Sequence, residues 1–191
     1  MAILTKHQLN NQTMRLFENA TESVNMFSAS DAETTVFLSH KHSDIKEVKE
    51  LKKLLENIGV HIYIDWLDPD MPKTTRGETA VKIKGKIKEN NKFILLATDG
   101  AVESKWCNWE LGYGDSLKLQ RDKIVLFPLR ESYDRSWNGS EYMQIYPVIE
   151  YENGSNTNNG GTQIAKGYYV FYPSKNNDRR YVSLIEWLKR N

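Results

Sequence analysis

The feature that most constrains the fold is a repeated alternation of short apolar runs with longer amphipathic stretches. The runs are rich in β-branched and aliphatic residues, as expected of strands buried on both faces, and they span 34–39, 60–64, 92–98 and 124–129. Helical periodicity occupies the intervals between them. Strands that alternate with helices at this spacing predict an α/β protein with a mainly parallel, flavodoxin-like central sheet and helices on both faces.

The first interval shows the helical pattern most clearly. One face of a helix over 44–59 would carry Ile45, Val48, Leu51, Leu55 and Ile58. Asp44 and Glu47 have the spacing of a capping pair, and Gly59 can close the carboxyl end. Similar helical stretches are expected over 78–90 and 104–119, whereas the two prolines of 65–72 predict a loop without regular structure.

Beyond residue 130 the pattern is less regular. Strands are expected over 145–150 and 168–172, separated by an Asn/Gly-rich loop, and a closing helix over 181–190.

The domain organisation follows from these patterns. An amphipathic helix is predicted within an N-terminal extension, 1–30, packed against a main domain that covers 31–191. Within that domain, 34–129 carries the core motifs and 130–191 is an elaboration with further strands and a helix. One domain of this size can bury one good core.

Composition excludes several classes of function. The formal net charge is +1, with 26 basic and 25 acidic residues, which gives no overall field for a nucleic acid or an anionic membrane. No apolar run is long enough for a signal peptide or a membrane span, so a soluble, cytoplasmic protein is expected. The single Cys107 and four unclustered histidines predict no metal site.

Candidate chemistry lies in the segments that follow the strands, since ligands of such sheets bind at the carboxyl ends of the strands. These segments contribute Ser39-His40-Lys41, Asp65-Trp66, Thr98-Asp99-Gly100 and a helix with Trp106 and Glu110 four residues apart. On a helix that spacing sets an aromatic plane beside a carboxylate, which suits a flat cationic ring. Composition alone favours the ordinary alternative, a core tryptophan and a solvated glutamate.

Three motifs in order, FLSHKHSD, IYIDWLD and SKWCNWELGYG, give the chain a resemblance to the TIR domain family over 34–129. The resemblance implies that Glu110 is the catalytic glutamate of NAD+-cleaving members and that Trp106 stacks on the nucleotide. It also implies that Ser39, His40 and Lys41 form the turn beside the ligand. Asp65 would close the second strand before the BB loop, 66–76, which begins with Trp66, and both residues would lie at the substrate site. His40 stands where the family usually has tyrosine.

Several of these positions admit two interpretations. His40 can stack or donate to a phosphate or ribose oxygen, or it can be a solvated turn residue. Lys41 can meet the NAD+ pyrophosphate or lie free on the surface. Asp65 is expected mainly to support the loop through its backbone, and Cys107 is expected to be a core residue and not a nucleophile.

The resemblance therefore predicts an enzyme that cleaves the nicotinamide–ribose bond of NAD+, a substrate and not a cofactor, to give ADP-ribose or a cyclic isomer. The extensions at both ends look like those of the TIR proteins of the Thoeris anti-phage system, whose signal acts on a separate effector. Self-association through the loop 66–76, with Leu67 and Met71, is expected as well.

The same residues also bear on functions of other classes. The main one is a non-catalytic TIR module that signals by assembly alone. A phospho-receiver would need an acidic pair after the first strand, where Ser39-His40-Lys41 stands, and a dehydrogenase would need a GxGxxG turn there.

Overall fold

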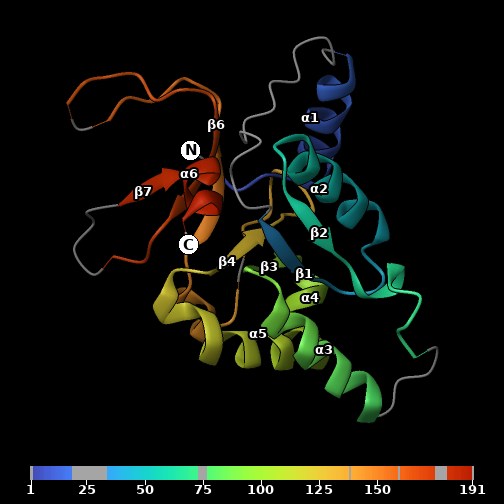
Figure 1. Cartoon of the computed structure of the whole chain (residues 1–191). Helices are drawn as coiled ribbons and strands as arrows, with labels where there is room; N and C mark the ends of the chain where they lie inside the picture. The colour runs from blue at the N-terminus through green and yellow to red at the C-terminus, as the bar shows by residue number, and fades with distance from the viewer. Residues whose placement is uncertain are drawn as a thin grey trace.

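A seven-stranded sheet in the order β2-β1-β3-β4-β5-β6-β7 runs through the middle of the protein (Figure 1). The computed structural model describes residues 2–18, 34–72, 77–137, 139–158, 160–174 and 180–190. The strands within these ranges are β1 (Thr35–Ser39), β2 (His61–Tyr63), β3 (Lys92–Ala97), β4 (Ile124–Pro128), β5 (Val148–Glu152), β6 (Gly167–Phe171) and β7 (Tyr181–Ser183).

Strands β1 to β5 pair in parallel, and β6 and β7 extend the sheet in antiparallel fashion. The register sets Phe93 of β3 beside Phe37 of β1 and Ile124 of β4. Every residue of β3 and β4 is buried, because helices cover both faces of this part of the sheet. The predicted α/β class and its mainly parallel sheet are confirmed.

Helices pack on both faces of the sheet, as the alternating pattern predicts (Figure 1). On one face α1 (Lys6–Glu18), α2 (Ile45–Asn57) and α6 (Leu184–Lys189) contribute to a hydrophobic cluster that we call the α2-side core. On the other face α3 (Gly77–Glu89), α4 (Asp99–Val102) and α5 (Lys105–Lys118) contribute to the α5-side core.

The first predicted helix is present, but its amino end differs from the prediction. The Asp44 side chain makes no capping bond to the helix, so the expected pair with Glu47 is wrong. Asp44 instead accepts a hydrogen bond from Thr98. Ile45 is 42% exposed, and Leu54 is buried on the helix. Gly59 adopts a φ of 84°, which a glycine reaches without strain, so the predicted closure of the helix is confirmed.

Three further local predictions need correction. The segment 65–72 contains a short 3₁₀ turn, Asp65–Leu67, because its prolines lie further along the chain. The strand expected over 145–150 begins three residues later, and Ile145 ends a 3₁₀ helix, Glu141–Ile145. The closing helix expected over 181–190 is split, since Tyr181–Ser183 pairs with β6 and Ser183 then caps α6.

The N-terminal helix packs along α2. Leu9 is fully buried in the α2-side core, and the Thr13 hydroxyl donates to Glu50 of α2. Lys6 pairs with Glu131 at 2.6 Å, which ties the helix to the segment after β4. The remainder of the predicted helical segment, from 19 to 30, lies outside the described residues. The proposed boundary between extension and main domain stays a prediction.

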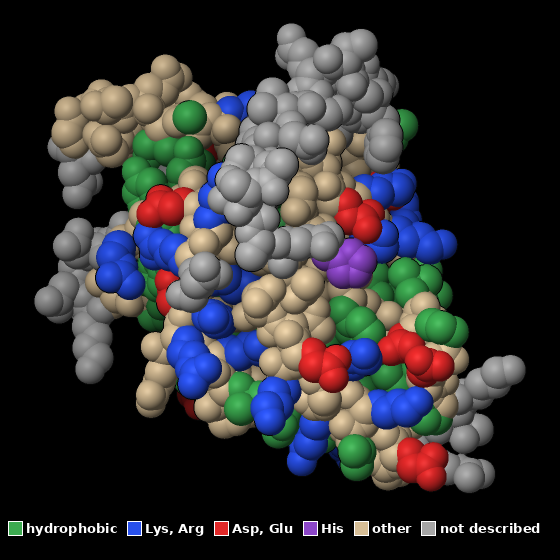
Figure 2. Space-filling view, in the orientation of Figure 1, with side chains coloured by type: hydrophobic (Ala, Val, Ile, Leu, Met, Phe, Trp, Pro, Cys, Tyr) green, Lys and Arg blue, Asp and Glu red, His purple; other side chains and the backbone are tan. Residues whose placement is uncertain are grey.

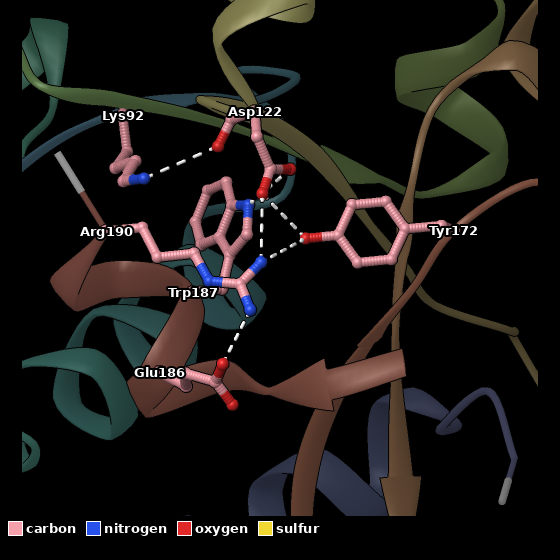
Figure 3. Close-up of polar contacts among 6 residues, drawn as sticks. All are labelled: Lys92, Asp122, Tyr172, Glu186, Trp187 and Arg190. Atoms are coloured by element: carbon pink, nitrogen blue, oxygen red, sulfur yellow. Dashed lines mark hydrogen bonds and ion pairs between the residues drawn. The ribbon is translucent and has the colours of Figure 1, made fainter. Parts of the chain in front are cut away.

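The C-terminal helix is fastened at the amino ends of β3 and β4 by Asp122 (Figure 3). Asp122 has a φ of 54°, and its carboxylate accepts from Tyr172 at 2.7 Å, Trp187 at 3.2 Å and Arg190 at 3.4 Å. The buried Lys92 ammonium lies 4.6 Å from the centre of the Trp187 ring. Basic side chains also gather on this part of the surface (Figure 2).

Candidate active site

The sheet changes its direction of winding between β1 and β3. The chain leaves β1 for α2 on one face and leaves β3 for α4 and α5 on the other face. In open α/β sheets the two departing turns separate at such a point, and the space at the carboxyl ends of the strands is the usual ligand site. The turns after Ser39 and Ala97 therefore frame the candidate site.

Glu110 lies at this point on α5 and is only 3% exposed. The helix is held at its start by Ser104, whose hydroxyl accepts from the Cys107 amide. Ser39 Oγ donates to Glu110 Oε2 at 2.5 Å. Side chains alternate along a strand, so Ser39 points to the same face as Phe37, which belongs to the α5-side core. The alternative of a solvated glutamate, which composition alone favours, is therefore wrong.

Burial changes the protonation of Glu110. Loss of water around the carboxyl raises its pKa from 4.5 to about 8, and the Asp65 carboxylate acts in the same direction. The hydrogen bond from Ser39 and a contact with Trp106 oppose the rise in pKa. At neutral pH the carboxyl is therefore mainly protonated when no ligand is bound.

Trp106 begins a row of aromatic rings along α5. Its ring centroid lies 5.0 Å from that of Trp109, which in turn lies 6.3 Å from Tyr113. Trp106 is half-buried and acts on the Glu110 carboxyl, so the two side chains share the predicted helical face. The expected pairing of an aromatic plane with a carboxylate is present.

His40 points to the opposite face of the sheet from Ser39 and is buried. Its Nδ1 donates to the Leu38 carbonyl at 2.8 Å, and its Nε2 lies 3.4 Å from Asp65 Oδ1. The imidazole meets the Trp66 ring edge-on, with centroids 4.5 Å apart. Burial lowers the pKa of His40, against the effects of the Leu38 carbonyl and Asp65. The interpretation of His40 as a solvated turn residue is wrong.

Asp65 supports the turn after β2, as the sequence predicts. Its Oδ1 accepts from the Trp66 amide at 2.8 Å. Trp66 is half-buried and packs against the α2-side core. The structure therefore sorts the predicted residues into two groups, with Ser39, Trp106 and Glu110 on the α5 side and His40, Asp65 and Trp66 on the α2 side.

The turns after β1 and β3 hold three further polar or small residues, Asp44, Thr98 and Gly100, whose contacts the sequence does not predict. Thr98 Oγ1 donates to Asp44 Oδ2 at 2.5 Å, which joins the turns after β1 and β3. Gly100 lies directly under the half-exposed side chain of Lys41. Their position after a buried strand was the only sequence signal, because no local pattern names a partner 54 residues away.

Trp137 also reaches this edge from the segment after β4. Its indole donates to the Ala97 carbonyl, the last residue of β3, at 2.7 Å. Nothing in the irregular sequence around Trp137 predicts this contact.

Other chemistries find little support in the described residues. Cys107 is buried, as expected, and desolvation raises the pKa of its thiol to about 11, which leaves it unreactive. Across the described ranges no group of three His, Cys, Asp or Glu side chains could hold a metal ion. No helix within them is long and apolar enough to cross a membrane.

The fold and the site define a doubly wound α/β protein with a buried glutamate at its switch point. Residues 36–157 match the family model described as TIR domain, and the chain belongs to this family. A Bacillus cereus (strain MSX-D12) protein named "Probable 3' cyclic ADP-D-ribose synthase ThsB'" is 30% identical over 160 residues, 82% of this chain and 76% of that protein.

A second relative matches a shorter part of the chain. A Cytobacillus dafuensis protein named "Putative cyclic ADP-D-ribose synthase TIR2" is 32% identical over 85 residues, which cover 43% of this chain and 22% of that protein.

Proposed function

We propose that this protein cleaves NAD+ at the bond between nicotinamide and ribose and forms a cyclic ADP-ribose signal in anti-phage defence. The observation that carries the proposal is the Glu110 carboxyl, buried at the switch point beside the Ser39 hydroxyl and the Trp106 indole. The names of both relatives support the same activity. NAD+ is the substrate in this scheme, and no separate cofactor takes part.

Glu110 acts as the electrostatic partner of the reacting ribose. The pyridinium of NAD+ carries a positive charge, and its approach favours the ionised carboxylate that burial otherwise disfavours. As the bond to C1′ breaks, nicotinamide leaves with the bonding electron pair and positive charge develops on the ribose. A carboxylate about 4 Å away stabilises that charge by about 4 kcal/mol at an effective dielectric near 20, about a thousandfold in rate.

The other predicted residues position this carboxylate and the substrate. The Ser39 hydroxyl fixes Oε2 of Glu110, and Trp106 also interacts with this carboxyl, so that it is held in place beside the reacting ribose. Trp106 offers its ring to the nucleotide, and Lys41 offers its charge to the pyrophosphate. His40 and Asp65 hold Trp66 at the start of the BB loop.

The fate of the ribosyl cation decides the product. Attack by water on C1′, with loss of one proton, gives ADP-ribose. Attack by a ribose hydroxyl or an adenine nitrogen of the same molecule gives a cyclic isomer. The name of the Bacillus relative favours the cyclic product, which would act on a separate effector protein.

We expect copies of the chain to assemble into the active form through the BB loop. Leu67 is 57% exposed on this loop, whereas Met71 packs against the α5-side core. Leu67 is thus the apolar side chain that the loop offers to a second copy. Assembly without catalysis, the alternative function, rests on the same residue.

The test is incubation of the purified protein with NAD+, with nicotinamide release followed and ADP-ribose separated from cyclic products by chromatography. Glu110→Gln is expected to lower turnover by roughly 10²–10⁴-fold, the usual weight of one positioned electrostatic group. The matched control is Glu78→Gln, since Glu78 is exposed on α3.

The assay is run in dilute buffer and under crowding, because the active form is expected to be assembled. Nicotinamide release that survives in Glu110→Gln would contradict the proposed mechanism. A wild-type protein that assembles but releases no nicotinamide under either condition would favour the non-catalytic alternative.

A further inference from the structure

The side chain of Lys41 lies across Gly100, in the turn that begins α4. A Cβ atom built on Gly100 would lie 2.8 Å from Cδ and 3.0 Å from Nζ of Lys41. Real Cβ atoms do not approach other atoms so closely, so the position of the ammonium depends on the absence of a side chain at residue 100.

The backbones of the two turns are held together, so Lys41 is not free to adjust as a whole. Asp44 joins them, because its carboxylate accepts from Thr98 at 2.5 Å and its amide donates to the Lys41 carbonyl at 2.9 Å. Thr98 also caps α4 by accepting from the Ala101 amide. With both turns fixed, Gly100 decides where the flexible end of Lys41 can rest.

This ammonium lies at the same edge of the sheet as the candidate catalytic carboxylate. Lys41 follows Ser39 by two residues, and Ser39 is bonded to Glu110. A half-exposed lysine at a switch point has the chemistry to bind phosphate as a point charge. We infer that Gly100 is a positioning residue that holds the Lys41 ammonium for the pyrophosphate of the substrate, an inference that rests on the proposed NAD+ cleavage.

Replacement of Gly100 by alanine separates this role from a structural one. Gly100 does not have a positive φ, so an alanine fits the backbone, and alanine favours a helix over glycine. The atoms that a methyl group would meet belong to the far end of a flexible side chain, which can move aside. The variant is therefore expected to be at least as stable as the wild type while its Lys41 ammonium is displaced.

The experiment measures KM and kcat for NAD+, and the dissociation constant for ADP-ribose, which keeps the pyrophosphate and lacks nicotinamide. Gly100→Ala is expected to raise both KM and this dissociation constant about tenfold, the lower end for a charge-assisted contact, with kcat changed less than about twofold. Gly85→Ala is the matched control on α3, where a Cβ would meet nothing closer than 4.0 Å.

A double-mutant cycle shows whether the effect passes through Lys41. In a Lys41→Met background, Gly100→Ala should change KM no further. An equal rise in KM in that background would overturn the inference, because the methyl group would then act directly on the ligand. An unchanged KM in Gly100→Ala alone would overturn it as well, with the proposed function intact. A wild type that neither cleaves NAD+ nor binds ADP-ribose would overturn both.

Discussion

The buried Glu110 carboxyl is expected to lower the free energy of unfolding, by an amount that depends on pH. The folded-state pKa of Glu110, about 8, lies above the ordinary glutamate value of 4.5. Between pH 4.5 and about 8 the Glu110 carboxyl is ionised in the unfolded chain but still protonated in the folded state. The folded state therefore loses stability as pH rises through this range. Glu110→Gln removes this dependence, because its amide is neutral, has the same shape and can still accept from Ser39.

The magnitude follows from the two pKa values. With 4.5 in the unfolded chain and about 8 in the folded one, the carboxyl costs less than about 1 kcal/mol at pH 5. The same linkage gives a destabilisation of about 4.5 kcal/mol at pH 8.5. The variant should therefore differ from the wild type by less than about 1 kcal/mol near pH 5 and exceed its free energy of unfolding by about 4.5 kcal/mol at pH 8.5, or roughly 12 °C in Tm.

Urea denaturation of both proteins at pH 5 and pH 8.5 measures this difference directly. The remaining titratable groups are common to both proteins and cancel when the free energies are subtracted. Glu78→Gln is again the control and should show no such trend, since Glu78 is exposed. A difference between Glu110→Gln and the wild type that stays constant with pH would refute the argument that burial raises the pKa of Glu110.

Three further predictions concern catalysis and packing. The kcat/KM for NAD+ should rise with pH and level off above about 8, because the ionised Glu110 is the active form, and a fall over pH 6–8 in a nicotinamide-release assay would contradict this. Trp137→Phe should cost about 1 kcal/mol in urea denaturation through loss of its bond to Ala97, and an unchanged midpoint would argue against that bond. Asp122→Gly tolerates the positive φ but frees Trp187, so it should lower stability by about 2 kcal/mol while kcat at the distant sheet edge stays unchanged.

The local predictions that succeeded rest on patterns that do not depend on distant residues. The strands β1, β3 and β4 are runs of buried apolar residues, and the α5 helix follows a clear periodicity after Ser104. The predictions that were wrong concern segments whose structure depends on a partner far away in the chain. Tyr181–Ser183 continues a helical pattern, yet it pairs with β6, and Asp44 leaves its expected helix cap to bind Thr98.

The sequence by itself determined the α/β order, the family and the identity of the candidate carboxylate. Short apolar runs, helical periodicity and three ordered motifs are all readable along the chain. Only the tertiary structure decided what state that carboxylate adopts. Glu110 becomes buried when β1 brings Ser39, 71 residues away in the chain, against α5. Desolvation belongs to the assembled site and to no single residue, which is why a glutamate of ordinary appearance in the sequence has a pKa near 8 in the fold.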